Sequence, residues 1–164
     1  QELCRLRDGG ADVESALAKM GEIGKTARIL FTVGNLDYIQ HGGRIGKMTG
    51  MAATLLDLKP LITLQDGEIH SSGIRRGRKK SIDGVIDLLC SYLKEQNCSP
   101  VQCNIAAGYG WNYEEGLLFQ QKTVSRLEAL YKTRVEIPLY QIGATIGVHA
   151  GPTSLGFGVI HKSM

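Results

Sequence analysis

The chain has 164 residues, 43% of them hydrophobic, and 19 basic against 16 acidic side chains give a net charge of +3. This much apolar content excludes intrinsic disorder, and so small a charge does not by itself indicate a nucleic-acid partner. The 21 glycines are unusual, because they amount to nearly twice the common share of roughly 7%. They follow no three-residue repeat, which excludes collagen, and the length favours one domain.

The first predicted elements are a helix, a strand and a short helix. Apolar residues recur at helical spacing across 13–23, and Asp12 stands where it can cap that helix. The apolar run 27–33 predicts a buried strand. Residues 35–40 predict a short helix, which the glycine pair 42–43 ends.

The middle of the chain predicts two helices with a hairpin between them. The small apolar residues of 46–56 favour a packed helix. The runs 59–64 and 68–74 are separated by a segment containing Asp-Gly at 66–67, which is typical of a β-hairpin. A clear helical stripe of apolar residues then follows across 82–93.

The last third predicts strands, a helix and a loop rich in aromatic residues. A strand over 101–107 leads into the loop 108–113, which we expect to pack on the body of the protein. A helix over 117–131 follows, and then strands over 134–140 and 155–160. Helices that alternate with strands, together with a hairpin, predict an α/β fold with a mixed β-sheet and packed helices.

The segment 137–161 contains no Asp, Glu, Lys or Arg and is long enough to raise the question of a membrane span. Two prolines and five glycines interrupt it, and a helix so broken would leave backbone groups unpaired in lipid. We therefore expect a buried segment of a soluble protein and no membrane insertion. The chain starts at Gln1 without an initiator Met or an apolar signal core, as in a fragment or a processed chain.

The four cysteines stand at positions 4, 90, 98 and 103. They do not form the CxxC pairs of a zinc site, and they are too few for a disulfide framework. We expect ordinary reduced thiols, a cytoplasmic protein and no metal site.

Five cations fall within residues 75–80, at the start of a predicted helix. The helix macrodipole disfavours positive charge there by roughly 0.3–1 kcal/mol per group. The cluster is therefore either a solvated turn or a contact for an acidic partner, a phosphate or a carboxylate, which arginine can bind through two parallel hydrogen bonds.

Two further side chains are candidates for a binding site. Arg44 lies among glycines, so it can either reach across a cleft or brace the backbone. His149 lies in the uncharged segment, where it is either a hydrogen-bonded core residue or a donor to an anionic oxygen. In the second case the Gly151-Pro152 turn would aim the imidazole. No second His or Cys stands at ligand spacing from His149, and the chain has no GxSxG nucleophile motif.

Five motifs in order resemble the DegV family of bacterial fatty-acid-binding proteins. They are TVGNLDYI at 32–39 with GGRI at 42–45, LKPLI at 58–62, DG at 66–67, RGRKK at 76–80, and HAGP at 149–152 with LG at 155–156. The resemblance covers nearly all of the chain but only the C-terminal domain of the family. It implies that residues 1–25 are the end of an interdomain connection and the first helix, and that 26–164 are the C-terminal α/β domain. The N-terminal domain, which supplies the lipid tunnel, would then be absent from this chain.

The resemblance also implies a carrier and not an enzyme. Such a protein binds a long-chain fatty acid and presents the carboxylate to a separate fatty-acid kinase that serves phospholipid synthesis. His149, Arg44 and Gly151 would lie near the lipid headgroup, and Arg76 and Arg78 would serve kinase docking. It implies no catalytic residue, metal or cofactor, and bound fatty acid only together with the N-terminal domain.

Two other functions stay open. A nucleic-acid-binding domain would use the basic turn of Arg75–Lys80 and the aromatic loop, although that loop carries no Lys or Arg. A hydrolase or transferase would centre on His149 and Arg44, but the sequence offers neither a nucleophile motif nor a pair of carboxylates to support it.

Overall fold

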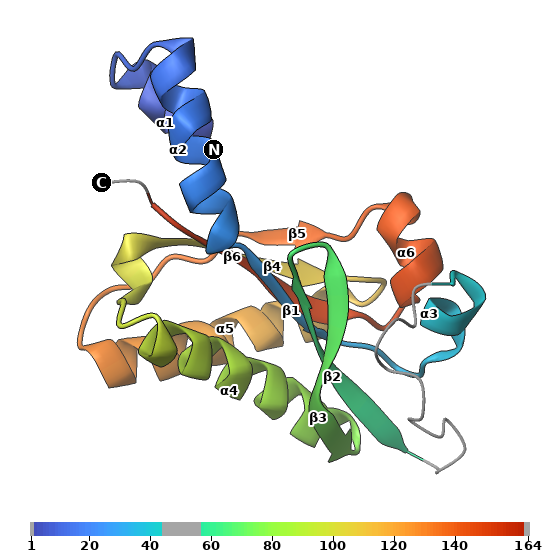
Figure 1. Cartoon of the computed structure of the whole chain (residues 1–164). Helices are drawn as coiled ribbons and strands as arrows, with labels where there is room; N and C mark the ends of the chain where they lie inside the picture. Colours follow the sequence, from blue (N-terminus) through green and yellow to red (C-terminus); the bar gives the residue numbers. More distant parts are fainter. Residues whose placement is uncertain (1, 44–56, 163–164) are drawn as a thin grey trace.

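The computed structural model describes residues 2–43 and 57–162. In these ranges six strands form one sheet in the order β3-β2-β1-β6-β4-β5 (Figure 1). The strands are β1 (Arg28–Thr32), β2 (Leu58–Gln65), β3 (Glu68–Arg76), β4 (Cys103–Tyr109), β5 (Leu139–Gln141) and β6 (Leu155–His161). Neighbouring strands are antiparallel except β4 and β5, which run parallel. The mixed sheet confirms the predicted fold class. Arg44 and the helix predicted over 46–56 lie outside the described residues.

Helices cover one face of the sheet and one of its ends. They are α1 (Glu2–Asp8), α2 (Val13–Lys25), α3 (Asp37–His41), α4 (Arg78–Glu95), α5 (Tyr113–Tyr131) and α6 (Ala144–Ala150). The long helices α4 and α5 lie side by side across one face (Figure 1). The main core lies between them and the sheet, where the rings of Phe119 and Phe157 stack with centroids 4.5 Å apart. The predicted stripe of α4 is confirmed, because Val85, Leu89 and Leu93 are fully buried in this core.

The predicted hairpin is confirmed between β2 and β3. Asp66 and Gly67 join the two strands with φ angles of 52° and 77°. A two-residue turn that matches the twist of its strands needs positive φ at both positions, which Asp-Gly tolerates well.

Helix α2 forms where it is predicted, but its apolar stripe is largely exposed. Asp12 caps the helix as expected, since its Oδ1 accepts a hydrogen bond from the backbone N–H of Ser15. Val13 and Leu17 are 75% and 55% exposed, and the stripe buries only Ile23. Figure 1 shows the reason, because α1 and α2 project away from the sheet instead of lying on it.

The uncharged segment 137–161 differs from its prediction. It forms β5, α6 and β6, and it is not buried throughout, since Ile146 and Val148 of α6 are 59% and 63% exposed. The strand predicted over 134–140 is reduced to β5, because side chains of α5 bind the backbone that precedes it. Gln120 donates to the carbonyl of Ile137 in this way. None of the helices in the described ranges combines the length and the apolar composition needed to cross a membrane.

The aromatic loop packs on the body only in part. Tyr109 belongs to β4, and its ring meets that of Tyr113 edge to face at 5.6 Å. Trp111 between them is 81% exposed, so for this residue the prediction is wrong. The backbone is bound at this residue and at the one before it: the N–H of Gly110 donates to the carbonyl of Ser154, and the N–H of Trp111 donates to that of Pro152. These bonds hold the loop against the 152–154 segment while the indole extends into solvent.

Candidate binding groove and basic turn

The sheet face opposite α4 and α5 carries an apolar groove of about 630 Å³. Strand alternation creates it: Leu30 points into the main core, while Ile29 and Phe31 of the same strand line the groove. Apolar side chains from several elements form its walls, among them Ile39, Leu64, Ile69, Ile142 and Ile146. Its lining is therefore mainly hydrocarbon, as in most sites that bind small apolar molecules.

Small residues of β4 and β6 form the floor of this groove. Ala106 lies opposite Gly158, and Gly108 lies opposite Gly156, on neighbouring antiparallel strands. A Cβ at Gly158 would meet nothing within 4 Å, whereas one at Gly156 would come within 2.5 Å of the carbonyl oxygen of Leu30. The groove is thus hollow because the sheet presents bare backbone there. This accounts for part of the glycine excess.

His149 lies at the wall of the groove, at the end of α6. Its Nδ1 is buried and has no hydrogen-bond partner among the described residues. The atom faces the backbone after α3, where a Cβ at Gly42 would lie only 2.3 Å away. The imidazole thus keeps an unused polar atom beside an apolar hollow, although buried polar atoms are normally paired.

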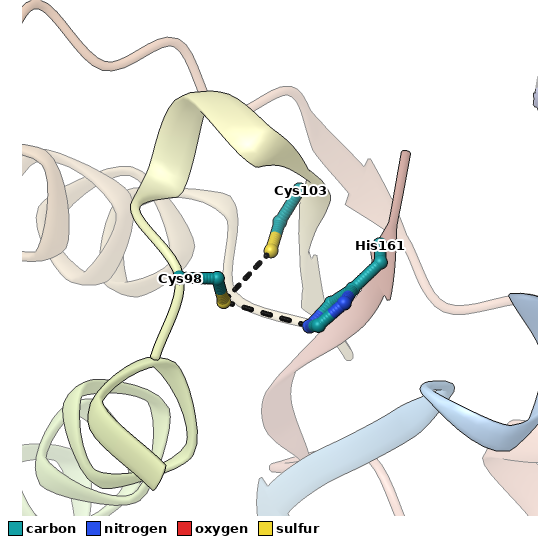
Figure 2. A group of neighbouring side chains, drawn as sticks. All are labelled: Cys98, Cys103 and His161. Carbon is teal, nitrogen blue, oxygen red and sulfur yellow. Dashed lines mark hydrogen bonds between the residues drawn. The ribbon is translucent and has the colours of Figure 1, made fainter. Parts of the chain in front are cut away.

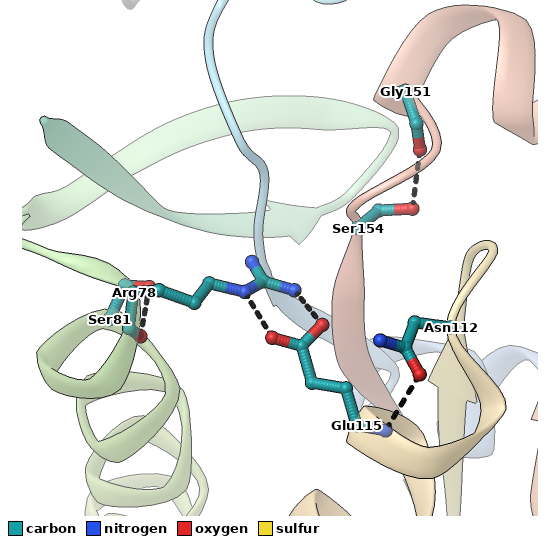
Figure 3. Close-up of polar contacts among 6 residues, drawn as sticks. All are labelled: Arg78, Ser81, Asn112, Glu115, Gly151 and Ser154. Carbon is teal, nitrogen blue, oxygen red and sulfur yellow. Dashed lines mark hydrogen bonds and ion pairs between the residues drawn. The ribbon is translucent and has the colours of Figure 1, made fainter.

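Gly151 fixes the turn after α6. Its φ of 79° suits glycine, and a Cβ there would lie 2.7 Å from the ring of Tyr38. The hydroxyl of Ser154 donates to the carbonyl oxygen of Gly151 at 2.9 Å (Figure 3). The turn that the sequence indicates at Gly151-Pro152 is therefore present, and it follows the end of α6, a helix that the sequence analysis does not predict.

The basic turn of residues 75–80 contains both exposed cations and a cation held in an ion pair. Arg76, Lys79 and Lys80 are exposed. Arg78 instead makes a bidentate ion pair with Glu115 of α5, in which Nε and Nη2 each lie 2.7 Å from a carboxylate oxygen (Figure 3). Glu115 offsets the charge at the start of α4, where the macrodipole opposes a cation. The Nη1 atom of Arg78 is buried and has no partner in the described part of the chain.

The register of the strands brings these residues to one end of the sheet. Thr32 at the end of β1 pairs with Leu155 at the start of β6. Leu58 at the start of β2 pairs with Arg76 at the end of β3. His149 and Gly151 precede β6, and Arg78 follows β3, so all four predicted site residues described by the structure lie around this end.

The groove itself was missed by sequence reasoning. The available signal was an alternation of small residues, at 106 and 108 in one strand and at 156 and 158 in another. That pattern becomes informative only when the two strands are known to be neighbours in register, because either one alone is merely a strand that contains glycine.

A family model for uncharacterised proteins of the DegV family matches residues 1–162. This chain belongs to the DegV family. Among curated relatives, a DegV domain-containing protein of Clostridium perfringens is 31% identical over 151 residues, covering 92% of this chain and 50% of the relative. A fatty acid-binding protein of Thermotoga maritima is 29% identical and covers 94% of this chain and 51% of its own length.

Solved structures agree with this assignment. A stearic acid-binding protein from Eubacterium ventriosum superposes with a TM-score of 0.86 at 36% identity, over 98% of this chain and 53% of that one. A DegV protein from Thermus thermophilus, described by its fatty acid binding, gives 0.75 at 26% identity, over 97% and 54%. The chain spans about half the length of the curated relatives it matches.

Proposed function

We propose that this DegV chain contributes one wall of a fatty-acid-binding site, with the acyl chain in the groove and the carboxylate at His149. The groove carries the proposal, because His149 lines its apolar hollow of about 630 Å³ and can act as a polar group there. Ligand pockets commonly measure about 300–1,000 Å³, and each buried methylene group contributes about 0.8 kcal/mol. Relatives that bind stearic acid and other fatty acids support the same ligand class.

This proposal changes which domain is expected to contact the acyl chain, compared with what the family resemblance implies. The resemblance places the lipid tunnel in an N-terminal domain, whereas here the open sheet face already offers an apolar surface for the acyl chain. We propose that a second domain covers the groove, so that residues 26–164 form the headgroup-side half of a shared cleft. Ligand binding then requires no catalytic residue in this chain.

At the polar end, His149 can donate a hydrogen bond to a carboxylate oxygen, and the bond is stronger when the imidazole is protonated. A carboxylate buried without such a donor costs several kcal/mol. Gly151 acts indirectly by holding the turn after α6. We include Arg44 in this headgroup region because it comes two residues after Gly42, whose backbone faces His149.

The exposed part of the basic turn suits docking of an acidic surface on the kinase. Arg76 projects from the end of β3, while Arg78 acts indirectly through its pair with Glu115. Arg76→Ala should therefore slow kinase-dependent phosphorylation of bound fatty acid, most strongly at low salt, and leave fatty-acid affinity unchanged. Equal loss of affinity and phosphorylation would place Arg76 at the lipid instead.

Filling the groove tests the proposal. Gly158→Leu places a side chain in open space on the groove floor, and Gly21→Leu makes the same exchange on exposed α2, where a Cβ also meets nothing within 4 Å. Titration with a fluorescent fatty acid should show at least a tenfold loss of affinity for Gly158→Leu and little change for Gly21→Leu. Unchanged binding by Gly158→Leu, with both variants folded by circular dichroism, would contradict the proposal.

A further inference from the structure

Two cysteines and a histidine that are distant in sequence converge at the other end of the sheet (Figure 2). The Sγ of Cys98 lies 3.5 Å from the Sγ of Cys103 and 3.5 Å from the Nε2 of His161. The three potential ligand atoms all lie within 4.8 Å of one another. We propose that Cys98, Cys103 and His161 bind a zinc ion, which differs from the expectation from the sequence that the chain holds no metal site.

The ligands sit on rigid parts of the fold. Cys103 opens β4 and lies directly opposite His161 of β6 in the antiparallel register. Cys98 follows α4, where its backbone N–H donates to the carbonyl of Leu93 after the left-handed residue Asn97. Register and helix end thus place the three side chains together without any special sequence spacing between them.

Two of the three separations are close to those that zinc requires, and the third, between Cys103 and His161, is at most 4.8 Å. In tetrahedral coordination, Zn–S bonds of about 2.3 Å and Zn–N bonds of about 2.0 Å place two sulfurs about 3.8 Å apart and sulfur and nitrogen about 3.5 Å apart. The observed pairs at 3.5 Å therefore need shifts of only a few tenths of an ångström. A disulfide between the cysteines would need an S–S separation of about 2.05 Å, so it would require a larger movement.

The surroundings also suit a cation held by thiolates. Cys103 is 4% exposed, and Cys98 and His161 are partly buried. When Zn²⁺ binds, each thiol releases its proton, and two thiolates with one divalent ion are neutral overall. No fourth Cys, His, Asp or Glu joins the cluster among the described residues, which leaves one coordination position for water.

Neighbouring groups contact the histidine. The backbone N–H of His161 donates to the hydroxyl of Thr26, and the ring of Tyr92 packs against the imidazole edge to face. Such outer contacts commonly orient metal ligands. Cys103 also lines a polar hollow of about 920 Å³.

The cluster lies at the opposite end of β4 and β6 from the basic turn, because Cys103 pairs with His161 and Tyr109 with Leu155. Bound zinc would join the end of α4 to both strands. Its expected effect is greater thermal stability, independent of fatty-acid binding.

The test is metal binding by the reduced 164-residue chain with matched cysteine variants. Zn²⁺ is titrated with a chromophoric competitor, and Co²⁺ serves as a spectroscopic probe for tetrahedral sulfur ligation. We expect one equivalent per chain, a sulfur-to-cobalt charge-transfer band and a higher melting temperature with Zn²⁺. Cys98→Ser and His161→Gln should weaken binding by more than the roughly 10–100-fold typical of losing an outer contact. Cys90→Ser, which removes a thiol outside the cluster, should bind like the wild type.

Several results would overturn the site. They are the absence of stoichiometric binding by folded wild-type chain, unchanged affinity in both Cys98→Ser and His161→Gln, or equal loss in Cys90→Ser. A Cys98–Cys103 disulfide that persists in excess phosphine reductant, detected by mass spectrometry, would replace the metal site with a redox pair. The metal-binding test does not use Cys103→Ser, because a substitution at that buried position could prevent folding.

Discussion

At the residue scale, His149 combines burial with an unused polar atom. Its Nδ1 is enclosed by the backbone around Gly42, and the described residues offer it no hydrogen bond. Leaving a buried polar atom unpaired typically costs about 1–3 kcal/mol. Because His149 also lines the groove, we propose that its imidazole provides the polar end of the site.

His149→Ala should therefore weaken binding of a fatty acid about tenfold, which corresponds to about 1.4 kcal/mol for one lost hydrogen bond. Binding of the corresponding methyl ester, which lacks the anionic oxygen, should change little. Isothermal titration with both ligands measures the difference. His70→Ala, on the far strand β3 and outside the groove lining, is the matched control. An equal loss for acid and ester would mean that the imidazole only shapes the groove.

At the element scale, the α4–α5 contact uses charge pairs of very different exposure. Arg78 and Glu115 are 25% and 28% exposed and bidentate, whereas Arg126 and Asp87 are 55% and 57% exposed and 3.4 Å apart. Solvent screens the second pair much more strongly, because exposed ion pairs rarely contribute more than about 1 kcal/mol. The first pair therefore fixes the start of α4 against α5.

Double-mutant cycles can separate these contributions. Arg78→Ala and Glu115→Ala should each lower the free energy of unfolding, with a coupling energy of about 1–2 kcal/mol, since solvent still reaches part of the pair. The cycle with Arg126→Ala and Asp87→Ala should give less than about 0.5 kcal/mol. Urea unfolding followed by circular dichroism measures both. Equal coupling in the two cycles would show that partial burial adds nothing to the pair.

At the scale of the whole molecule, apolar surface is distributed unevenly. The main core fills the side of the sheet under α4 and α5, while the opposite face holds the groove and α2 exposes most of its stripe. A hydrophobic face of this kind marks an interaction surface. We interpret the groove and the α2 stripe together as surfaces suited to cover by a second domain.

The α2 stripe makes this interpretation measurable. Leu17→Ala should change the free energy of unfolding of this chain by less than about 0.5 kcal/mol, because Leu17 is 55% exposed. Ile23→Ala on the same helix, where the side chain is 8% exposed, should cost about 2 kcal/mol or more. Comparable losses at both positions would show that Leu17 is packed in the folded chain.

Much of the fold depends on local sequence patterns, and these elements can be predicted from the sequence. Periods of two and 3.6 residues located most strands and helices, Asp-Gly at 66–67 located the hairpin, and Asp12 located the start of α2. Helix α6 was missed because glycines at 143, 147 and 151 are typical of turns, although the carbonyl of Gly143 accepts the helical bond from Gly147. The short motifs also predicted the family correctly.

The sequence by itself determined most of the helices and strands, the fold class and the family, because each depends on neighbours along the chain. Only the tertiary structure decided which faces are covered and which residues meet. Strand register sets Ala106 opposite Gly158 and Cys103 opposite His161, and helix packing sets Arg78 against Glu115. These contacts join residues far apart in sequence, so no local pattern contains them. Three of the glycines that contribute to the excess, Gly108, Gly156 and Gly158, form the groove floor only once β4 and β6 are paired.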